Sequence, residues 1–262
     1  MAVIQMNLSS RYLMMDTSVT VIIPVLSGGN NEKTLEEVYR RDVKYPTLYL
    51  LHGYSGDSTN WLRYTSIKRY ANEKRLAVVM PSGYNSFYTD IPYGFKCWSY
   101  ISEELPLAMR AIFPLSEKRE ENFVAGLSMG GYGAMKWALR KPEFFSAAAS
   151  LSGALDIVEI VESAEPEGKR GFENVFGDPS KLRGSDNDLF YLAENLVKEN
   201  KTSPRLYMAC GTEDFLYPAN IRFKEHLIRL GYDITYEEGR GTHNWYFWDK
   251  YIRRVIDWIF SV

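Results

Sequence analysis

Short runs of β-branched and aliphatic residues alternate along the chain with longer stretches in which apolar residues recur every three or four positions. Such alternation is typical of a parallel β-sheet covered by helices. The compact apolar runs suit strands buried on both faces, and we expect them at 47–51, 76–80, 122–127, 147–151, 206–210 and 234–238. The longer stretches predict helices near 61–73, 96–113, 130–141, 187–199, 218–230 and 245–260, with a kink or restart at Pro106.

Two further apolar runs, 3–8 and 18–23, lie near the start of the chain. They are too close together for a crossover helix, so we expect them to form an antiparallel pair at the edge of the sheet. With this pair the sheet has about eight strands, most of them parallel and flanked by helices. The order of the elements therefore predicts an α/β fold.

One stretch, 152–204, interrupts the alternation of strands and helices. It contains the charged, glycine-broken run 165–171, which indicates a loop. We interpret 152–204 as a small cap inserted before the next strand, and 1–262 as a single domain. The aspartates of this stretch are expected to be solvated loop residues, and they are Asp156, Asp178, Asp186 and Asp188.

Residues 126–131 read Gly-Leu-Ser-Met-Gly-Gly and match the pattern Gly-x-Ser-x-Gly. In α/β-hydrolases this pattern forms a sharp turn between a strand and a helix that exposes the serine. The pattern alone is weak, because about 0.1 matches are expected by chance at this glycine and serine content. A strand run precedes the pattern and a helical run follows it, in the order that the nucleophile turn requires. The alternative is a glycine-rich turn between a strand and a helix that contains a serine by chance. Ser128 is therefore the predicted nucleophile.

Only three histidines occur in the sequence, which narrows the choice of a general base. The α/β-hydrolase triad follows the chain order Ser, then Asp or Glu, then His, so His52 is excluded because it precedes the serine. His226 lies within an amphipathic helical run on the flank of the sheet. His243 follows the last predicted strand, at the carboxyl edge where the catalytic groups of such sheets gather. His243 is therefore the predicted base.

The carboxylate that orients the histidine should follow the strand that precedes the strand of His243. Glu213 and Asp214 both follow the run 206–210, and either side chain could accept a hydrogen bond from an imidazole. The pattern does not decide between them by itself.

An acyl-transfer site also needs N–H donors for the oxyanion that forms in the transition state. The N–H of Met129, the residue after the nucleophile, is one predicted donor. The second is the N–H of Tyr54, in the loop after an early strand, where Gly53 permits close approach; a plain strand-ending turn is the alternative. The candidate residues of a short substrate pocket are Gly53, Trp61 and Trp245, and Tyr54 is expected to bound it as well.

Composition restricts the partners. The net charge of -2 and the pI near 6.0 give no basic field for nucleic acid, so we expect a small-molecule partner. No run approaches the roughly 18 apolar residues that a membrane span requires, and the first residues lack an export signal. Cys97 and Cys210 are too few for a disulfide framework and lack metal-ligand spacing, which favours free thiols in the cytoplasm. The sequence leaves open whether the chain is a homo-oligomer.

Four separated segments resemble the tributyrin esterases of the esterase D group of α/β-hydrolases: 50–56 with Asn60-Trp61, 125–133, 210–217 and 241–246. The resemblance covers nearly the whole chain and favours Asp214 over Glu213 as the acid. The wider group includes S-formylglutathione hydrolases, feruloyl and acetylxylan esterases and mycolyltransferases, so the resemblance implies the triad more firmly than the substrate. Formylglutathione enzymes usually carry Ser-Gly-Leu-Thr-Cys where 52–56 reads His-Gly-Tyr-Ser-Gly, which argues against that branch.

These observations predict a cytoplasmic serine carboxylesterase that hydrolyses short-chain acyl esters through an acyl-enzyme, with no metal and no organic cofactor. The charged 152–204 stretch is a poor wall for long acyl chains. An alternative is a deacylase of acetylated or feruloylated sugars, with a stacking surface formed by Trp61, Tyr88, Tyr93, Trp98 and Trp245, although aromatics at such places are more often core. A silent binding protein on the same fold would be expected to lack a triad residue.

Overall fold

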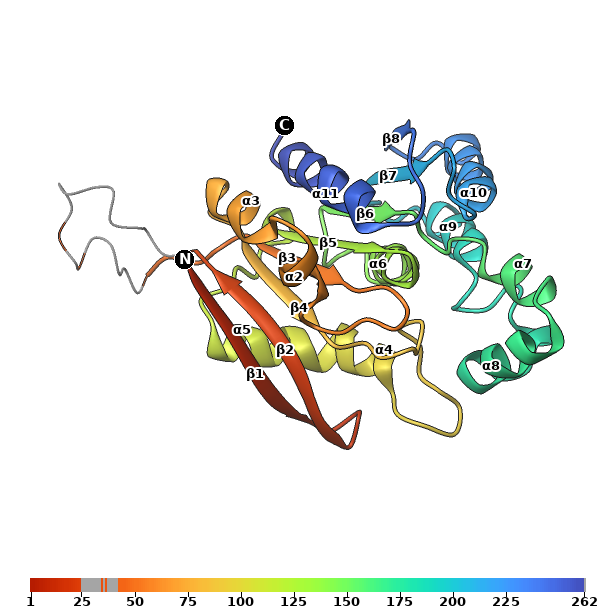
Figure 1. Ribbon diagram of the computed structural model, residues 1–262, viewed down its shortest axis with the longest axis horizontal. Helices are drawn as coiled ribbons and strands as arrows, with labels where there is room; N and C mark the ends of the chain where they lie inside the picture. Colours follow the sequence, from red (N-terminus) through yellow and green to blue (C-terminus); the bar gives the residue numbers. More distant parts are fainter. Residues whose placement is uncertain (25–33, 35, 37–41, 262) are drawn as a thin grey trace.

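The computed structural model of the chain describes residues 1–24, 34, 36 and 42–261. Within this part, eight strands form one sheet in the order β1-β2-β4-β3-β5-β6-β7-β8 (Figure 1). The strands are β1 (Ala2–Ser10), β2 (Met15–Ile23), β3 (Thr47–Leu51), β4 (Ala77–Pro81), β5 (Asn122–Leu127), β6 (Ala147–Leu151), β7 (Arg205–Gly211) and β8 (Ile234–Gly239).

The sheet is antiparallel at one edge and parallel elsewhere. β1 pairs with β2, and β2 with β4, in antiparallel register, whereas all remaining neighbours are parallel. The sequence prediction of an antiparallel edge pair on a mostly parallel sheet of about eight strands is confirmed.

Helices cover both faces of the sheet (Figure 1). The α-helices of the described residues are α2 (Asn60–Tyr64), α3 (Ile67–Glu73), α4 (Cys97–Ser99), α5 (Leu105–Ile112), α6 (Met129–Arg140), α7 (Ile157–Glu162), α8 (Pro166–Phe176), α9 (Leu189–Lys198), α10 (Tyr217–Arg229) and α11 (Trp245–Ile259). Successive strand residues point to opposite faces, so Tyr49 and Leu51 join one core with α5, α6, α9 and α10. Leu48 and Leu50 join the other core with α3 and α11.

Two predicted helices are interrupted. The stretch 61–73 forms α2 and α3, because Thr65 is extended between them and Ser66 donates its N–H to Asp249 Oδ1 at 2.8 Å. The stretch 96–113 runs from α4 through a π-helical segment, Tyr100–Glu104, into α5, and Pro106 lies in the first turn of α5. The helix continues across this point, with the Leu105 N–H donating to the Tyr100 carbonyl, five residues earlier. Such a π-helical turn accommodates Pro106, which has no N–H of its own to donate.

The prediction of a loop at 165–171 is wrong, because these residues belong to the entry into and first part of α8. Pro166 starts the helix, and the helix presents Phe172 and Phe176 to the ring of Phe87, with ring centroids 5.7 and 5.5 Å apart. Tertiary contact of these rings outweighs the low helix propensity of the glycines.

The segment between β6 and β7 carries α7, α8 and α9, and Figure 1 shows α7 and α8 at one end of the molecule. The prediction that its aspartates are solvated loop residues is wrong for Asp188 and Asp156. Asp188 is 6% exposed and accepts from the N–H groups of Gly184 and Phe190, at 2.9 and 3.1 Å, which caps α9. Asp156 caps α7 and forms an ion pair with Arg222. No helix in the described part of the chain is long and apolar enough to cross a membrane.

Candidate active site

The residues singled out from the sequence meet at the carboxyl edge of the sheet. Ser128 follows β5, Asp214 follows β7, His243 follows β8, and the loop with Gly53 and Tyr54 follows β3. These strands are parallel, so their carboxyl ends lie at the same edge, where α/β sheets place their ligands.

The turn at Ser128 depends on two glycines. Ser128 has φ 53° and ψ -120°, a left-handed backbone that costs a non-glycine residue free energy. A Cβ on Gly126 would lie 2.2 Å from the carbonyl oxygen of Gly130, and a Cβ on Gly130 would lie 2.4 Å from that of Leu51. Only glycine fits these positions, and the close packing holds the serine at the tip of the turn.

Ser128, His243 and Asp214 form a continuous hydrogen-bonded chain. His243 Nε2 lies 3.0 Å from Ser128 Oγ, and His243 Nδ1 lies 2.9 Å from Asp214 Oδ2 and 3.1 Å from Oδ1. The distances fall within the range over which a base removes a hydroxyl proton. This arrangement can activate a serine for attack on an acyl carbon.

The carboxylate of Asp214 is fully buried and well supplied with donors. Burial alone would raise the pKa of Asp214, but hydrogen bonds from His243, from the Leu216 N–H at 2.9 Å and from Ser152 outweigh it, so the pKa lies below its usual value. Asp214 therefore stays ionised at neutral pH. Glu213, the alternative that the pattern left open, is partly exposed and pairs with Arg240 at 3.1 Å.

Aromatic rings hold His243 in place. Phe215 lies on one side, with ring centroids 4.7 Å apart, and Trp248 meets the imidazole edge-on at 4.9 Å. Trp248 in turn donates its indole N–H to Ser152 Oγ at 3.2 Å. The imidazole thus has little freedom to leave the line between Asp214 and Ser128.

The backbone donors predicted for an oxyanion flank the nucleophile. Met129 is the first residue of α6, whose N-terminal N–H groups have no intrahelical acceptor. Gly53 approaches the nucleophile closely, because a Cβ on it would lie 3.4 Å from the Cβ of Ser128. Within the described residues, the N–H groups of Tyr54 and Met129 donate to no protein acceptor. Both are available to a ligand beside Ser128.

A pocket of about 560 Å³ opens at this site. It is lined by Gly53, Tyr54, Ser55, Gly56, Asn60, Tyr64, Leu127, Ser128, Phe215, His243, Asn244, Trp245 and Trp248. Gly53, Tyr54 and Trp245 line it as expected.

Trp61 does not line the pocket and is a correction to the predicted set. It is 1% exposed, donates its indole N–H to the Leu51 carbonyl at 2.9 Å, and packs edge-on behind Trp245 at 5.4 Å. Sequence reasoning missed Trp248 in the wall. The signal was its i,i+3 spacing from Trp245 on a helix that begins directly after His243.

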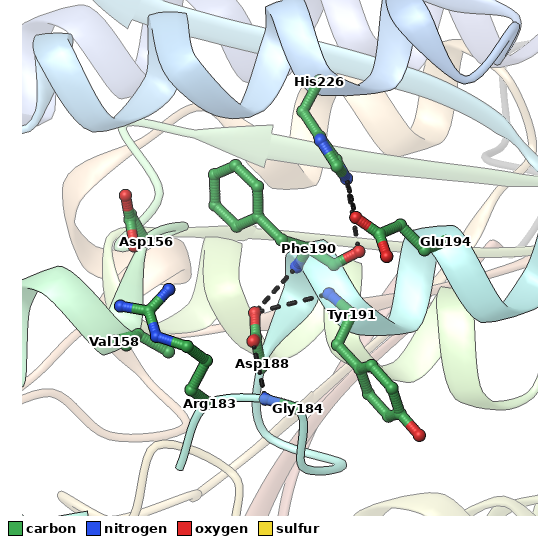
Figure 2. A pocket seen from close by; sticks show the side chains of 9 residues that line it. All are labelled: Asp156, Val158, Arg183, Gly184, Asp188, Phe190, Tyr191, Glu194 and His226. Carbon is green, nitrogen blue, oxygen red and sulfur yellow. Dashed lines mark hydrogen bonds and ion pairs between the residues drawn. The ribbon is translucent and has the colours of Figure 1, made fainter. Parts of the chain in front are cut away.

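A second cavity, of about 380 Å³, lies between α7, α9 and α10, away from the triad (Figure 2). His226 is in its wall, as expected for the flank of a helix, with Nε2 3.3 Å from the Phe190 carbonyl oxygen and 3.7 Å from Glu194. Asp188, seen below Phe190 in Figure 2, is occupied by backbone N–H groups. In the described residues, no group of three or more His, Cys, Asp or Glu side chains could hold a metal ion.

Comparison with known proteins shows the family of the chain. The sequence model of the Esterase family matches residues 33–255. The chain is 37% identical over 270 residues to an acetyl esterase of Caldicellulosiruptor saccharolyticus, covering 100% of this chain and 99% of that protein.

Two solved Staphylococcus aureus structures are similar over nearly their whole length. Fluorophosphonate-binding serine hydrolase F, with substrate bound, has a TM-score of 0.87 and 39% identity, covering 100% of this chain and 99% of that one. S-formylglutathione hydrolase, as apoenzyme, has a TM-score of 0.85 and 38% identity, covering 99% of each chain. The chain therefore belongs to the Esterase family and is a serine-type carboxylic ester hydrolase with the α/β-hydrolase fold.

Proposed function

We propose that this esterase hydrolyses short-chain acyl esters through an acyl-enzyme on Ser128, with His243 as general base and Asp214 as the residue that orients the imidazole. The observation that carries the proposal is the 3.0 Å approach of His243 Nε2 to Ser128 Oγ, with Asp214 2.9 Å from Nδ1. The chemistry requires no metal and no organic cofactor.

In the first half of the reaction, Ser128 Oγ attacks the ester carbonyl carbon and its proton passes to His243 Nε2. The N–H groups of Tyr54 and Met129 stabilise the oxyanion, a contribution worth about 100-fold or more in rate for each donor. The carbon–oxygen bond of the ester then breaks, and the alcohol leaves with the proton from His243. Water attacks the acyl-enzyme in the second half, with His243 again accepting and returning a proton.

The walls of the pocket support a preference for short acyl chains. The lining residues come from the loop after β3 and from α2, from the end of β5 and the turn after it, from the loops after β7 and β8, and from the start of α11. Residues 152–204 contribute none. Each methylene group gains only about 0.8 kcal/mol, and only where it is buried against apolar side chains. The distal part of a long acyl chain would extend beyond the residues that line this pocket. Tributyrin and acetyl, propionyl and butyryl esters therefore fit the pocket better than long-chain esters.

A panel of p-nitrophenyl esters from about two to sixteen carbons tests the preference, with kcat/KM expected to fall steeply beyond about eight carbons. A maximum at twelve carbons or more would refute it. Ser128→Ala should abolish both turnover and fluorophosphonate labelling, and full activity in that variant would overturn the triad assignment. S-formylglutathione belongs in the same panel, because one similar structure carries that name.

A second candidate is deacylation of acetylated sugars, favoured by one feature of the rim. Tyr64 and Trp245 both line the pocket and stack on each other, with ring centroids 4.9 Å apart and planes at 29°. Such a surface can pack against a sugar ring. Of the other rings considered, Trp61, Tyr88 and Trp98 are buried, and Tyr93 is exposed outside this pocket. Tyr64→Ala should raise KM for an acetylated xylo-oligosaccharide and leave KM for ethyl acetate unchanged if sugars are the substrates.

We also propose that the enzyme acts in the cytoplasm. Cys97 and Cys210 are both free and buried thiols, a cysteine usage common in reducing compartments. Fractionation of cells that express the tagged chain tests this, and recovery outside the cytoplasm would contradict it.

A further inference from the structure

A lysine is buried in the middle of α6, and no carboxylate of the described residues forms an ion pair with it. Lys136 is 1% exposed, and its Nζ donates to the Tyr88 carbonyl at 3.0 Å, to Thr89 Oγ1 at 2.8 Å and to Asn187 Oδ1 at 2.7 Å. Burial lowers the pKa of Lys136 well below its usual value. The rings of Trp98 and Tyr132 also lie against the ammonium group, with Nζ 5.3 and 5.6 Å from their centroids. Burying a charge that has no paired carboxylate is still unfavourable, and an apolar side chain would fill a purely structural role at lower cost.

The segment that Lys136 holds has an unfavourable backbone. Phe87 and Tyr88 are consecutive non-glycine residues in the left-handed region, with φ 49° and 50°. The Tyr88 ring is fully buried between two glycines, since a Cβ on Gly83 or Gly133 would lie 2.2 or 2.4 Å from it. Lys136 thus fixes the carbonyl of Tyr88 while the glycines fix its ring.

The same segment supports the loop that follows β3. The Tyr88 hydroxyl donates to the His52 carbonyl at 2.8 Å, and the Gly83 N–H donates to His52 Nε2 at 2.8 Å. Asn85 Oδ1 accepts from the Ser55 N–H at 2.7 Å. The loop from His52 to Ser55 is therefore attached to residues 83–88 at both of its ends.

His52 converts this support into a direction for one peptide group. Because Nε2 accepts from the Gly83 N–H, the ring proton is on Nδ1, which donates to the Gly53 carbonyl at 2.7 Å. The Gly53 carbonyl and the Tyr54 N–H belong to one planar trans peptide group and point in opposite directions. Fixing the carbonyl of Gly53 therefore fixes the direction of the Tyr54 N–H.

We propose that Lys136 is a positioning residue for the oxyanion hole, acting through Tyr88 and His52 on the Tyr54 N–H. The proposal rests on the oxyanion role proposed above for that N–H. Without Lys136, the left-handed segment at 87–88 can relax, and the Tyr54 N–H is held less firmly on the oxyanion, although the Gly56 N–H still donates to the Gly53 carbonyl at 3.1 Å. Loss of a donor costs about 100- to 1000-fold in kcat, so misdirection of one should cost about 10- to 100-fold.

The test compares Lys136→Met and Tyr88→Phe, which remove opposite ends of the connection. With p-nitrophenyl acetate, both should lower kcat with little change in KM, and both should weaken binding of a trifluoromethyl ketone by a factor similar to the loss in kcat/KM. The double variant should be no slower than the slower single variant, because both remove the same support. An unchanged kcat in folded Lys136→Met, or losses that multiply in the double variant, would overturn the proposal.

Tyr232→Phe is the matched control. Its hydroxyl is buried and donates to the Ala193 carbonyl at 2.8 Å, the same kind of bond that Tyr88 makes, but among the described residues it makes no hydrogen bond to 52–56 or 83–89. It should leave kcat within about twofold, and a loss equal to that of Lys136→Met would mean a general packing effect.

Tyr88→Phe and Ser128→Ala together separate this inference from the proposed function. If Lys136→Met does not fold, Tyr88→Phe decides alone, because it removes a single oxygen and unchanged kcat in it overturns the connection. Loss of activity in Ser128→Ala with normal kcat in Tyr88→Phe would refute only the positioning role. Full activity in Ser128→Ala would refute the proposed function itself.

Discussion

Replacing Asp214 by asparagine should reverse the hydrogen-bond direction at the imidazole. Asp214 Oδ1 accepts from the Leu216 N–H at 2.9 Å, so the amide oxygen of asparagine must occupy that position, because the opposite orientation sets two donors against each other. The amide nitrogen then takes the place of Oδ2, 2.9 Å from His243 Nδ1, and donates to it. The ring proton moves to Nε2, which can no longer accept from Ser128.

The expected loss follows from this wrong tautomer. A comparable change in a serine protease lowers kcat about 10,000-fold, which corresponds to about 5 kcal/mol at 1.36 kcal/mol for each factor of ten. The assay is the pre-steady-state burst of p-nitrophenol from p-nitrophenyl acetate, because it isolates acylation, the step in which Ser128 must lose its proton. The burst rate of Asp214→Asn should fall by that factor, with binding of substrate little changed.

Glu213→Gln is the matched control, since it makes the same chemical change one residue earlier, at a side chain that pairs with Arg240 instead of the imidazole. It should keep the burst rate within about threefold. A normal burst in Asp214→Asn, or a severe loss in Glu213→Gln, would show that the orienting carboxylate has been assigned to the wrong residue.

Three further predictions concern stability. Gly130→Ala should destabilise the folded protein by about 1–3 kcal/mol, because its Cβ would meet the Leu51 carbonyl oxygen. Gly171→Ala should stabilise it by about 0.5–1 kcal/mol, because this glycine lies in a helix and its Cβ would meet nothing within 4 Å. Thermal unfolding measures both. Trp61→Phe should cost about 1–3 kcal/mol in urea unfolding, because the buried Leu51 carbonyl loses its indole donor. Burial lowers the pKa of His52, so the unfolded state binds more protons than the folded state below about pH 6.5. The free energy of unfolding should therefore decrease as the pH is lowered below about 6.5, by up to about 1.4 kcal/mol per pH unit. Urea titrations at several pH values give the free energy of unfolding at each pH, and its dependence on pH should be weaker in His52→Gln than in the unmodified protein.

Much of this fold could be predicted because the signals are local. Thr47–Leu51 and Asn122–Leu127 are buried along their whole length, so an uninterrupted apolar run is sufficient to identify such central strands. The turn at Ser128 identifies itself through glycines that are required by its own backbone. The position of His243 after the last strand then follows from chain order.

What could not be predicted depends on contacts between distant segments. The sequence of α8 resembles that of a loop, because its glycines and charges are visible locally. Its helical structure depends on Phe172 and Phe176, whose rings contact Phe87, a residue far away in the sequence. The burial of Trp61 could not be predicted, because the sequence pattern of a helix as short as α2 does not show which of its side chains face the core. Lys136 did leave a signal, a charge between Met135 and Trp137 in an apolar helix, but its three acceptors lie 47, 48 and 51 residues away.

The left-handed backbone at Ser128 means that this enzyme is not as stable as its own fold allows. A glycine would adopt φ 53° and ψ -120° without the penalty of about 1–2 kcal/mol that a side chain incurs there, so Ser128→Gly should be an inactive protein that melts at a higher temperature. The nucleophile is thus retained against a thermodynamic gradient, as expected where activity and stability conflict. Directed evolution for heat resistance without a simultaneous demand for activity would be expected to discard this serine early.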